Sequence, residues 1–537
     1  MRVEGKIVDI YNQEIYEGSV EFHDGVITNI ERHSTDVQSY IMLGFIDAHV
    51  HIESSMLRPT LFGDLVAAQG TVGVVTDPHE IANVLGVEGV EFMMDDAKGA
   101  PIKIYFTIPS SVPATPFDVA GGVITSADVE QLARSGRFVA LSEVMNVPGV
   151  LFRDEEVMAK LAVAKRYGLP IDGHSPLLYG DELTQYIESG ISTDHESLIF
   201  EGALEKIEKG MKILIREGSA AKNYESLSEL IATYPDSLMF CTDDSHPDDI
   251  IEIGHINKIV RRAIKDGYPL FDVLKIACVN PILHYKLGIG TLRVGESADF
   301  IVVEELTQFK LERLYIDGEL RYNAANQPEK SPQKSIAINN FHHDPISPKE
   351  LELALRGEAN VIELIKNELI TKLSHYTHGS STTNFESDPD SDIAKIVYIN
   401  RYTNGTPQVA LCRGFGLKRG AIASSIGHDS HNIVAVGCSD GEICDAVNLI
   451  IANRGGLSLC DGDTKEILPL PIGGIMSDRM GAEVAAEYGR LQAMIKGLGS
   501  TLDAPYMTLS FLSLVVIPDV KIGEKGLFSY TDFDWID

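Results

Sequence analysis

The stretch Gly44-Phe45-Ile46-Asp47-Ala48-His49-Val50-His51 is an apolar run that ends in two histidines spaced i, i+2. Side chains two positions apart on a β-strand point to the same side of the sheet, so His49 and His51 can bind one metal ion together. In a (β/α)8 barrel the catalytic groups lie at the carboxyl ends of the strands. A strand that ends in a ligand pair therefore favours this fold.

Seven more short apolar segments follow, which gives eight expected strands. Segments of helical pattern, such as 181–189, lie between many of them. Alternating strands and helices predict parallel pairing with right-handed crossovers, and eight such units close a barrel. The expected strands are residues 43–50, 72–76, 102–108, 138–144, 169–173, 191–194, 211–216 and 238–242.

The 537 residues are too many for one ordinary core, so we expect several domains. Residues 1–40 alternate apolar and polar positions, and strand character returns after the barrel, which predicts that both flanks pair. A polar stretch with prolines, from about 323 to 350, indicates a linker. Three domains are predicted: a small β-sandwich of residues 1–42 and 286–325, a TIM-type barrel of residues 43–285, and a C-terminal α/β domain of residues 350–537. In the second part of the β-sandwich we expect strands at 290–294, 298–303 and 314–318. In the C-terminal domain we expect strands at 393–399 and 433–436 and a helix at 483–496.

The composition excludes several classes of partner. Acidic residues outnumber basic ones by 78 to 45, for a formal charge of −33, so the surface should repel nucleic acids and anionic membranes. The six cysteines lack CxxC spacing, which favours a reducing compartment. No signal-peptide pattern opens the sequence, and no uncharged apolar run approaches the ~20 residues of a membrane span. We expect a cytoplasmic homo-oligomer.

Further ligand-type residues stand at the ends of other expected strands. Glu143, His174 and His195 end the fourth, fifth and sixth strands, and Asp243 and Asp244 end the eighth. Four histidines and two carboxylates exceed the needs of one tetrahedral ion, so we predict two ions with Glu143 as the bridging ligand. Asp243 is preferred as the other carboxylate ligand, with Asp244 as the alternative, because the strand register decides which one faces the pocket.

Longer motifs extend beyond these ligands. They are Ile52-Glu53-Ser54-Ser55, Asp77-Pro78-His79-Glu80-Ile81-Ala82-Asn83-Val84, Pro113-Ala114-Thr115-Pro116, Thr193-Asp194-His195-Glu196, Arg216-Glu217-Gly218-Ser219-Ala220-Ala221-Lys222-Asn223, Cys241-Thr242-Asp243-Asp244, Gly473-Gly474-Ile475-Met476-Ser477-Asp478 and Met507-Thr508-Leu509-Ser510-Phe511-Leu512. With these motifs, nearly the whole chain resembles the adenine deaminases of the amidohydrolase superfamily. The resemblance implies a hydrolase that converts adenine to hypoxanthine and ammonia in purine salvage.

The resemblance also implies a metal centre and a mechanism. Two divalent ions per chain are expected, with Mn²⁺ first and Fe²⁺ or Zn²⁺ as alternatives. Adenine deaminases use a glutamate where many relatives use a carboxylated lysine, and Glu143 occupies that position. Two cations lower the pKa of a bridging water from ~15.7 towards 7, and the hydroxide would attack C6 of adenine. Asp243 would be a metal ligand that also moves the water proton to the leaving ammonia.

Residues near other strand ends are candidates for contact with the purine. Glu80, Asp118 and Glu196 are three candidate donors of a proton to ring N1, and the sequence does not choose among them. Arg216 and Ser219 are expected to read the purine edge. Asp118 stands where the family is expected to have glutamate, so its shorter side chain either changes this contact or supports a loop.

Two other functions are compatible with parts of the pattern. A cyclic-amide hydrolase, similar to dihydroorotases or hydantoinases, could use the same hydroxide on a carbonyl carbon. A silent barrel that binds metal or partners is opposed by the complete ligand set. The segment His428-Asp429-Ser430-His431-Asn432 resembles a ligand motif, but we interpret it as a polar turn or a lid.

Overall fold

A computed structural model describes residues 1–326, 338–366, 368–379 and 381–536. Their backbone forms two compact units. The first unit contains Met1–Pro78, Phe92–Ser110 and Thr125–Pro332, and the second contains His79–Glu91, Ser111–Ile124 and Gln333–Asp537. These units are not the three predicted domains, whose boundaries stay predictions. Part of the expected linker lies outside the described residues.

The first unit contains the eight strands predicted for the barrel. Five form one parallel sheet: β5 (Phe45–Val50), β6 (Thr71–Thr76), β7 (Lys103–Ile108), β8 (Phe138–Val144) and β9 (Ile171–Gly173). Three form another: β10 (Thr193–Asp194), β11 (Lys212–Arg216) and β12 (Leu238–Cys241). Backbone hydrogen bonds join the sheets at both edges, from Ser192 to Ile171 (2.9 Å) and from Asp243 to His49 (3.0 Å). This is the strand order of a (β/α)8 barrel.

Helices follow most of these strands and bury one apolar face each. Every residue of β5 and β6 is buried, as expected for parallel strands that are covered on both sides. In α12, Ile256, Ile259, Val260 and Ala263 recur at helical spacing and are fully buried. The helices whose residues all lie in this unit are α1 (Pro59–Ala67), α4 (Ser126–Arg134), α5 (Val147–Leu151), α6 (Glu155–Tyr167), α7 (Gly180–Glu188), α8 (Phe200–Glu208), α9 (Tyr224–Leu227), α10 (Leu230–Thr233), α11 (Pro247–Glu252), α12 (Ile256–Lys265), α13 (Leu270–Leu274) and α14 (Asn280–Tyr285).

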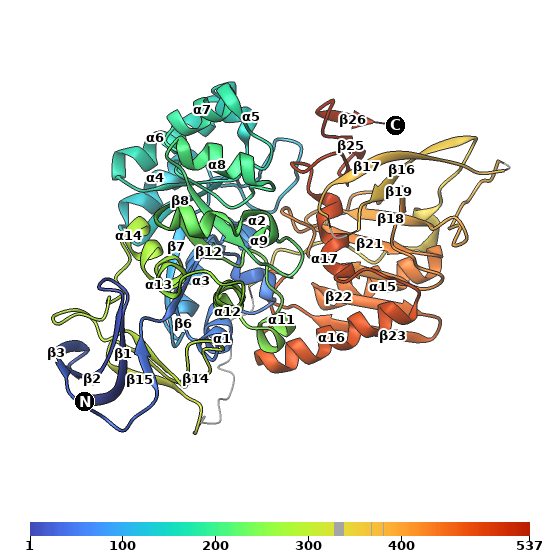
Figure 1. Ribbon diagram of the computed structural model, residues 1–537. Coiled ribbons are helices and arrows are strands. Elements are labelled where there is room, and N and C mark those ends of the chain that lie inside the picture. Colours follow the sequence, from blue (N-terminus) through green and yellow to red (C-terminus); the bar gives the residue numbers. More distant parts are fainter. Residues whose placement is uncertain (327–337, 367, 380, 537) are drawn as a thin grey trace. The chain divides into compact units, whose positions relative to one another are not determined.

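The two flanks of the barrel meet in one seven-stranded sheet. Strand β4 pairs in parallel with β1 and antiparallel with β13, which joins the N-terminal strands to the later ones. Figure 1 shows the N-terminal strands β1, β2 and β3 in the same part of the molecule as β14. The strands are β1 (Arg2–Asp9), β2 (Glu14–His23), β3 (Val26–Arg32), β4 (Tyr40–Met42), β13 (Phe300–Val303), β14 (Leu311–Ile316) and β15 (Glu319–Asn323). The pairing of the flanks is therefore as predicted, whereas the two-layered sandwich stays a prediction.

The strand expected at 290–294 is not formed. Leu292 has a positive φ of 59°, which a strand does not accommodate. The Thr291 hydroxyl donates a hydrogen bond of 2.7 Å to the Glu296 carboxylate and holds a local turn. Hydrophobic pattern alone did not reveal this competing side-chain contact.

The second unit is built on an eight-stranded, mainly antiparallel sheet in the order β17-β16-β19-β18-β21-β20-β22-β23. The strands and helix predicted at 393–399, 433–436 and 483–496 are present. Its elements are α2 (His79–Leu85), β16 (Glu358–Leu364), β17 (Thr371–Thr377), β18 (Ile393–Ile399), β19 (Gln408–Arg413), β20 (Ala421–Ser424), β21 (Ile433–Gly437), α15 (Asp440–Asn453), β22 (Gly456–Asp461), β23 (Thr464–Pro469), α16 (Gly481–Gly497), α17 (Pro505–Ser510), β24 (Val520–Gly523), β25 (Gly526–Ser529) and β26 (Asp534–Ile536), and α3 (Val87–Ala97) has residues in both units.

Side-chain contacts fix the helices of the second unit. Ser439 caps α15 by accepting a hydrogen bond from the Glu442 backbone, and Ile443, Val447 and Ile450 of that helix lie in a buried cluster. Helix α2 is held by its C-terminal end, because the Asn340 side chain donates to the Val84 carbonyl oxygen at 3.1 Å. Among the described residues, no helix combines the length and apolar character that a membrane crossing requires.

A buried ion pair stabilises the strand end that carries His195. Lys206 of α8 lies 2.8 Å from the Asp194 carboxylate, and both side chains are inaccessible. Burial alone would raise the pKa of Asp194, but Lys206 and nearby hydrogen-bond donors lower it well below its usual value. Lys206→Met should therefore leave an unpaired buried charge and lower the free energy of unfolding by about 3–5 kcal/mol, measured by urea denaturation.

Lys209→Met is the matched control for this substitution. Lys209 directly follows α8 and pairs with Glu205 near the surface, at 2.9 Å. Loss of the Lys209–Glu205 ion pair should lower the free energy of unfolding by less than about 1 kcal/mol. Equal effects of the two substitutions would contradict a special role for the buried pair.

Candidate metal centre

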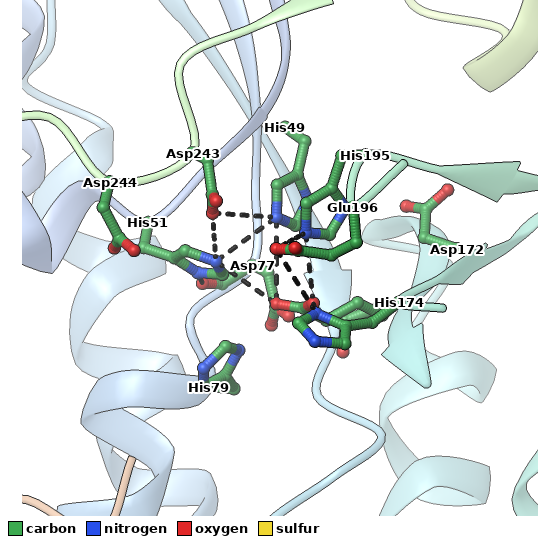
Figure 2. Close-up of polar contacts among 12 residues, drawn as sticks. His49, His51, Asp77, His79, Asp172, His174, His195, Glu196, Asp243 and Asp244 are labelled. Carbon is green, nitrogen blue, oxygen red and sulfur yellow. Dashed lines mark hydrogen bonds and ion pairs between the residues drawn. The ribbon is translucent and has the colours of Figure 1, made fainter. Parts of the chain in front are cut away.

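The ends of five barrel strands bring the six predicted metal ligands together. All six side chains belong to residues that are at most 9% exposed. In Figure 2 the labelled histidines at these strand ends turn their rings toward one another. The ligands are His49 and His51 of β5, Glu143 of β8, His174 after β9, His195 after β10 and Asp243 after β12.

Glu143 lies between two pairs of histidines. Its Oε1 atom is 3.2 Å from His51 Nε2 and 3.8 Å from His49 Nε2. Its Oε2 atom is 2.7 Å from His174 Nδ1 and 3.4 Å from His195 Nε2. Each carboxylate oxygen thus faces its own pair of imidazoles, which is the arrangement that a bridging carboxylate requires.

The two aspartates after β12 have different surroundings. Asp243 Oδ1 lies 3.1 Å from His51 Nε2 and 3.5 Å from His49 Nε2. Asp244 also has a ligand atom within 4.8 Å of those of His51 and Asp243, but its Oδ1 accepts a hydrogen bond from the Ser54 hydroxyl. The Asp243 backbone has a positive φ of 57°, which alters the strand alternation at this point. This geometry supports the preference for Asp243.

Arg216 connects the centre to Glu196. Its guanidinium donates to Asp243 Oδ2 at 2.6 Å and to Glu196 Oε2 at 3.1 Å, and the residue is 2% exposed. Glu196 Oε1 in turn lies 3.6 Å from His195 Nε2. Burial raises the pKa of Glu196, but Arg216 and the nearby histidines lower it more, so that the carboxylate is ionised.

The remaining predicted substrate residues lie elsewhere. Ser219 is in the loop after β11, where its hydroxyl accepts a hydrogen bond from the His246 backbone at 2.8 Å. Glu80 and Asp118 belong to the second unit. Asp118 accepts a hydrogen bond of 2.7 Å from the Thr115 hydroxyl, and burial raises its pKa to about 6. Asp118 thus supports its own loop, and its contact with substrate stays a prediction, as does that of Glu80.

The electrostatics of the six side chains fit a cationic occupant. Burial raises the pKa values of Glu143 and Asp243, but neighbouring positive groups hold both well below the usual range. Burial lowers the pKa of His195, yet Glu143 and other carboxylates raise it to about 9. Such buried carboxylates and imidazoles attract protons in the absence of another cation, and divalent ions can take the place of those protons. The donor set of imidazoles and carboxylates suits manganese, iron and zinc.

Asp47 is a structural partner that the sequence interpretation missed. Its carboxylate lies 3.0 Å from His255 Nε2 and accepts a hydrogen bond of 3.1 Å from the Thr242 backbone. It therefore connects β5 to the end of β12, directly before Asp243. An acidic residue inside an apolar strand needs a buried partner, so the position of Asp47 in the sequence already indicated such a contact.

Comparisons with known proteins agree on one group. The family model described as "Amidohydrolase family" matches residues 40–321, and that described as "Adenine deaminase C-terminal domain" matches residues 368–534. The chain is 48% identical to a protein of Sulfurovum sp. named adenine deaminase, with 100% of this chain and 99% of the relative covered. It is 45% identical to a protein of the same name from Methanosarcina barkeri, with 99% and 98% covered.

One solved structure is also similar over part of the chain. It is the β-aspartyl dipeptidase of Fervidobacterium islandicum AW-1 in complex with the β-Asp-Leu dipeptide. The identity is 15% and the TM-score is 0.47, with 62% of this chain and 100% of that chain covered.

Proposed function

This chain belongs to the adenine deaminase family of the amidohydrolases, and we infer from that membership and from its metal centre that it hydrolyses adenine to hypoxanthine and ammonia. Its substrate is a small purine base. We place the reaction in purine salvage in the cytoplasm and expect a homo-oligomer. The observation that carries the chemistry is the Glu143 carboxylate, whose two oxygens face two separate pairs of histidines.

We propose that two divalent ions bind between these groups. His49, His51 and Asp243 would hold one ion, His174 and His195 would hold the other, and Glu143 would join them. Mn²⁺ is the expected metal, with Fe²⁺ and Zn²⁺ as alternatives. When bound, such a pair of cations lowers the pKa of water from ~15.7 towards 7 and so supplies hydroxide for attack on C6.

Asp243 is the proposed proton carrier. Oδ1 faces the two histidines of β5, and Oδ2 accepts a hydrogen bond from Arg216. As an ionised carboxylate beside the reacting water, Asp243 can accept the water proton and deliver it to the amino group, which then leaves as ammonia. Arg216 fixes the orientation of the carboxylate during this transfer.

Glu196 is the acid that we propose for contact with ring N1. Of the three candidates, it lies in the same unit as the ligands, beside His195 and His174. Arg216 holds it ionised, so a proton must reach Glu196 before it can be donated to N1. Ser219 and Arg216 are expected to limit the orientations of the purine.

Turnover of adenine by the purified protein tests this function. Loss of adenine absorbance should accompany stoichiometric ammonia release, stop after removal of metal by a chelator, and return with Mn²⁺. Dihydroorotate and hydantoin serve as comparison substrates. Hydrolysis of a cyclic amide without deamination of adenine would assign the barrel to that other reaction, and inactivity of the manganese-loaded protein on adenine would reject our proposal.

A further inference from the structure

A second cluster of ligand-type side chains lies entirely within the second unit. It joins the start of α2 to residues 427–432, which precede β21. Glu80 Oε1 is 2.7 Å from His428 Nδ1 and 3.5 Å from His79 Nε2. Asp429 Oδ1 is 3.7 Å from His428 Nδ1 and 3.9 Å from His79 Nε2. Residues 348 positions apart in the sequence thus meet through their polar atoms.

Three of these donor atoms, one each from His79, Glu80 and Asp429, lie within 4.8 Å of one another, as the ligands of one metal ion do. Zn²⁺ bonds of about 2.0–2.2 Å at tetrahedral angles place neighbouring ligand atoms about 3.3–3.6 Å apart. In this cluster three carboxylate–histidine separations, of 3.5, 3.7 and 3.9 Å, lie in or near this range, and the fourth, of 2.7 Å, is the hydrogen bond between Glu80 and His428. Around Glu143 in the barrel, the separations from the histidines range from 2.7 to 3.8 Å. The two clusters therefore have the same dimensions.

Burying the charged side chains of this cluster without a cation costs free energy. His79, Glu80, His428 and Asp429 are between 2% and 5% exposed. Two imidazoles and two carboxylates are donors that bind zinc-like ions, and the two negative charges would balance one divalent cation. A charged group buried in protein is stable only when it is paired or coordinates a metal.

His431 adds an independent observation. The residue is 1% exposed, and its Nδ1 atom makes no hydrogen bond. Its Nε2 atom forms an ion pair with Glu80 Oε2. A ring nitrogen this deeply buried is usually hydrogen-bonded, so Nδ1 of His431 is an unpartnered polar atom on a side chain that contacts the cluster. His431 lies against the second oxygen of Glu80 and so positions that carboxylate.

We propose that His79, Glu80, His428 and Asp429 bind a divalent metal ion of the zinc type, additional to those of the barrel centre. This ion ties α2 to residues 427–432 and stabilises the second unit. Glu80 is then a ligand of this site and not the acid that protonates the purine. The segment 428–432, interpreted from its sequence as a polar turn or lid, supplies half of the ligands.

Zinc content measures this site directly. The protein is stripped with a chelator, saturated with Zn²⁺, freed of excess metal on a desalting column and analysed by mass spectrometry for zinc per chain. Asp429→Asn and His428→Gln should each lower the content by about one ion per chain. The exposed residues Asp463 and His375 of the same unit provide the matched controls, Asp463→Asn and His375→Gln, which should leave the content unchanged.

Crystals of the unmodified, zinc-saturated protein give a second test that does not depend on the folding of a variant. An anomalous peak at the zinc edge is expected among Glu80, His428 and Asp429. Absence of that peak at full occupancy of the barrel ligands would overturn the proposal, as would an unchanged zinc content in folded Asp429→Asn protein. Neither measurement depends on adenine turnover, so the proposed reaction can fail while this site stands, and the reverse.

Discussion

Replacing Glu143 by glutamine should lower kcat for adenine by at least about 10³-fold, which corresponds to about 4 kcal/mol of activation free energy. The substitution keeps the size of the side chain but removes its charge and turns one oxygen into an amide nitrogen. One of the two histidine pairs would then lose its carboxylate neighbour, because Oε1 and Oε2 face different pairs. The metal content of the barrel should therefore fall together with the activity.

Two measurements on the same sample test this expectation. Steady-state kinetics give kcat, and mass spectrometry gives metal per chain after desalting. Glu130→Gln is a suitable control, because Glu130 lies on α4 and its carboxylate pairs with the exposed side chain of Arg166, not with any of the six predicted ligands. If Glu143→Gln retained full turnover and all of its metal, the bridging role would be wrong.

The sequence predicted the barrel strands well because their signal is local. Each of the eight expected segments overlaps an observed strand, and the helix expected at 181–189 overlaps α7. Ligand positions followed from the same reasoning, since parallel strands direct their carboxyl ends to one face. The shortest strands, β9 and β10, begin later than expected because periodicity does not fix where pairing starts.

Sequence patterns did not predict the contacts between segments that are distant in the chain. The positive backbone φ of Asp243, which bears on the preference for Asp243 over Asp244, is not encoded in the strand pattern. Arg216 was expected to read the purine, yet its nearest partners are Glu196 and Asp243. Glu80 was a candidate for contact with the purine, and the sequence did not indicate its partners His428 and His431, which follow more than 340 residues later. Such pairs become visible only when tertiary structure joins the segments.

Asp243→Asn should lower kcat by about 10²–10⁴-fold, the usual range for loss of a general acid–base group. Asparagine still offers an oxygen toward His49 and His51, so part of the metal should remain bound. It cannot accept the water proton, and it leaves the Arg216 guanidinium with Glu196 as its remaining ionised partner at this position. The loss of kcat should therefore exceed the loss of metal, measured on one preparation.

Asp244→Asn separates this role from a general effect of charge at the end of β12. Asp244 accepts a hydrogen bond from Ser54 through Oδ1, and an asparagine oxygen can accept the same bond. We expect its kcat to change by less than about tenfold, since no proton transfer is lost. If Asp244→Asn were the more damaging of the two, Asp244 would be the proton carrier and the assignment drawn from Asp243 Oδ1 would be wrong. If each variant lost metal and activity in equal proportion, Asp243 would act only as a metal ligand. The proton would then have to move through another group, and Glu196 is the nearest ionised candidate.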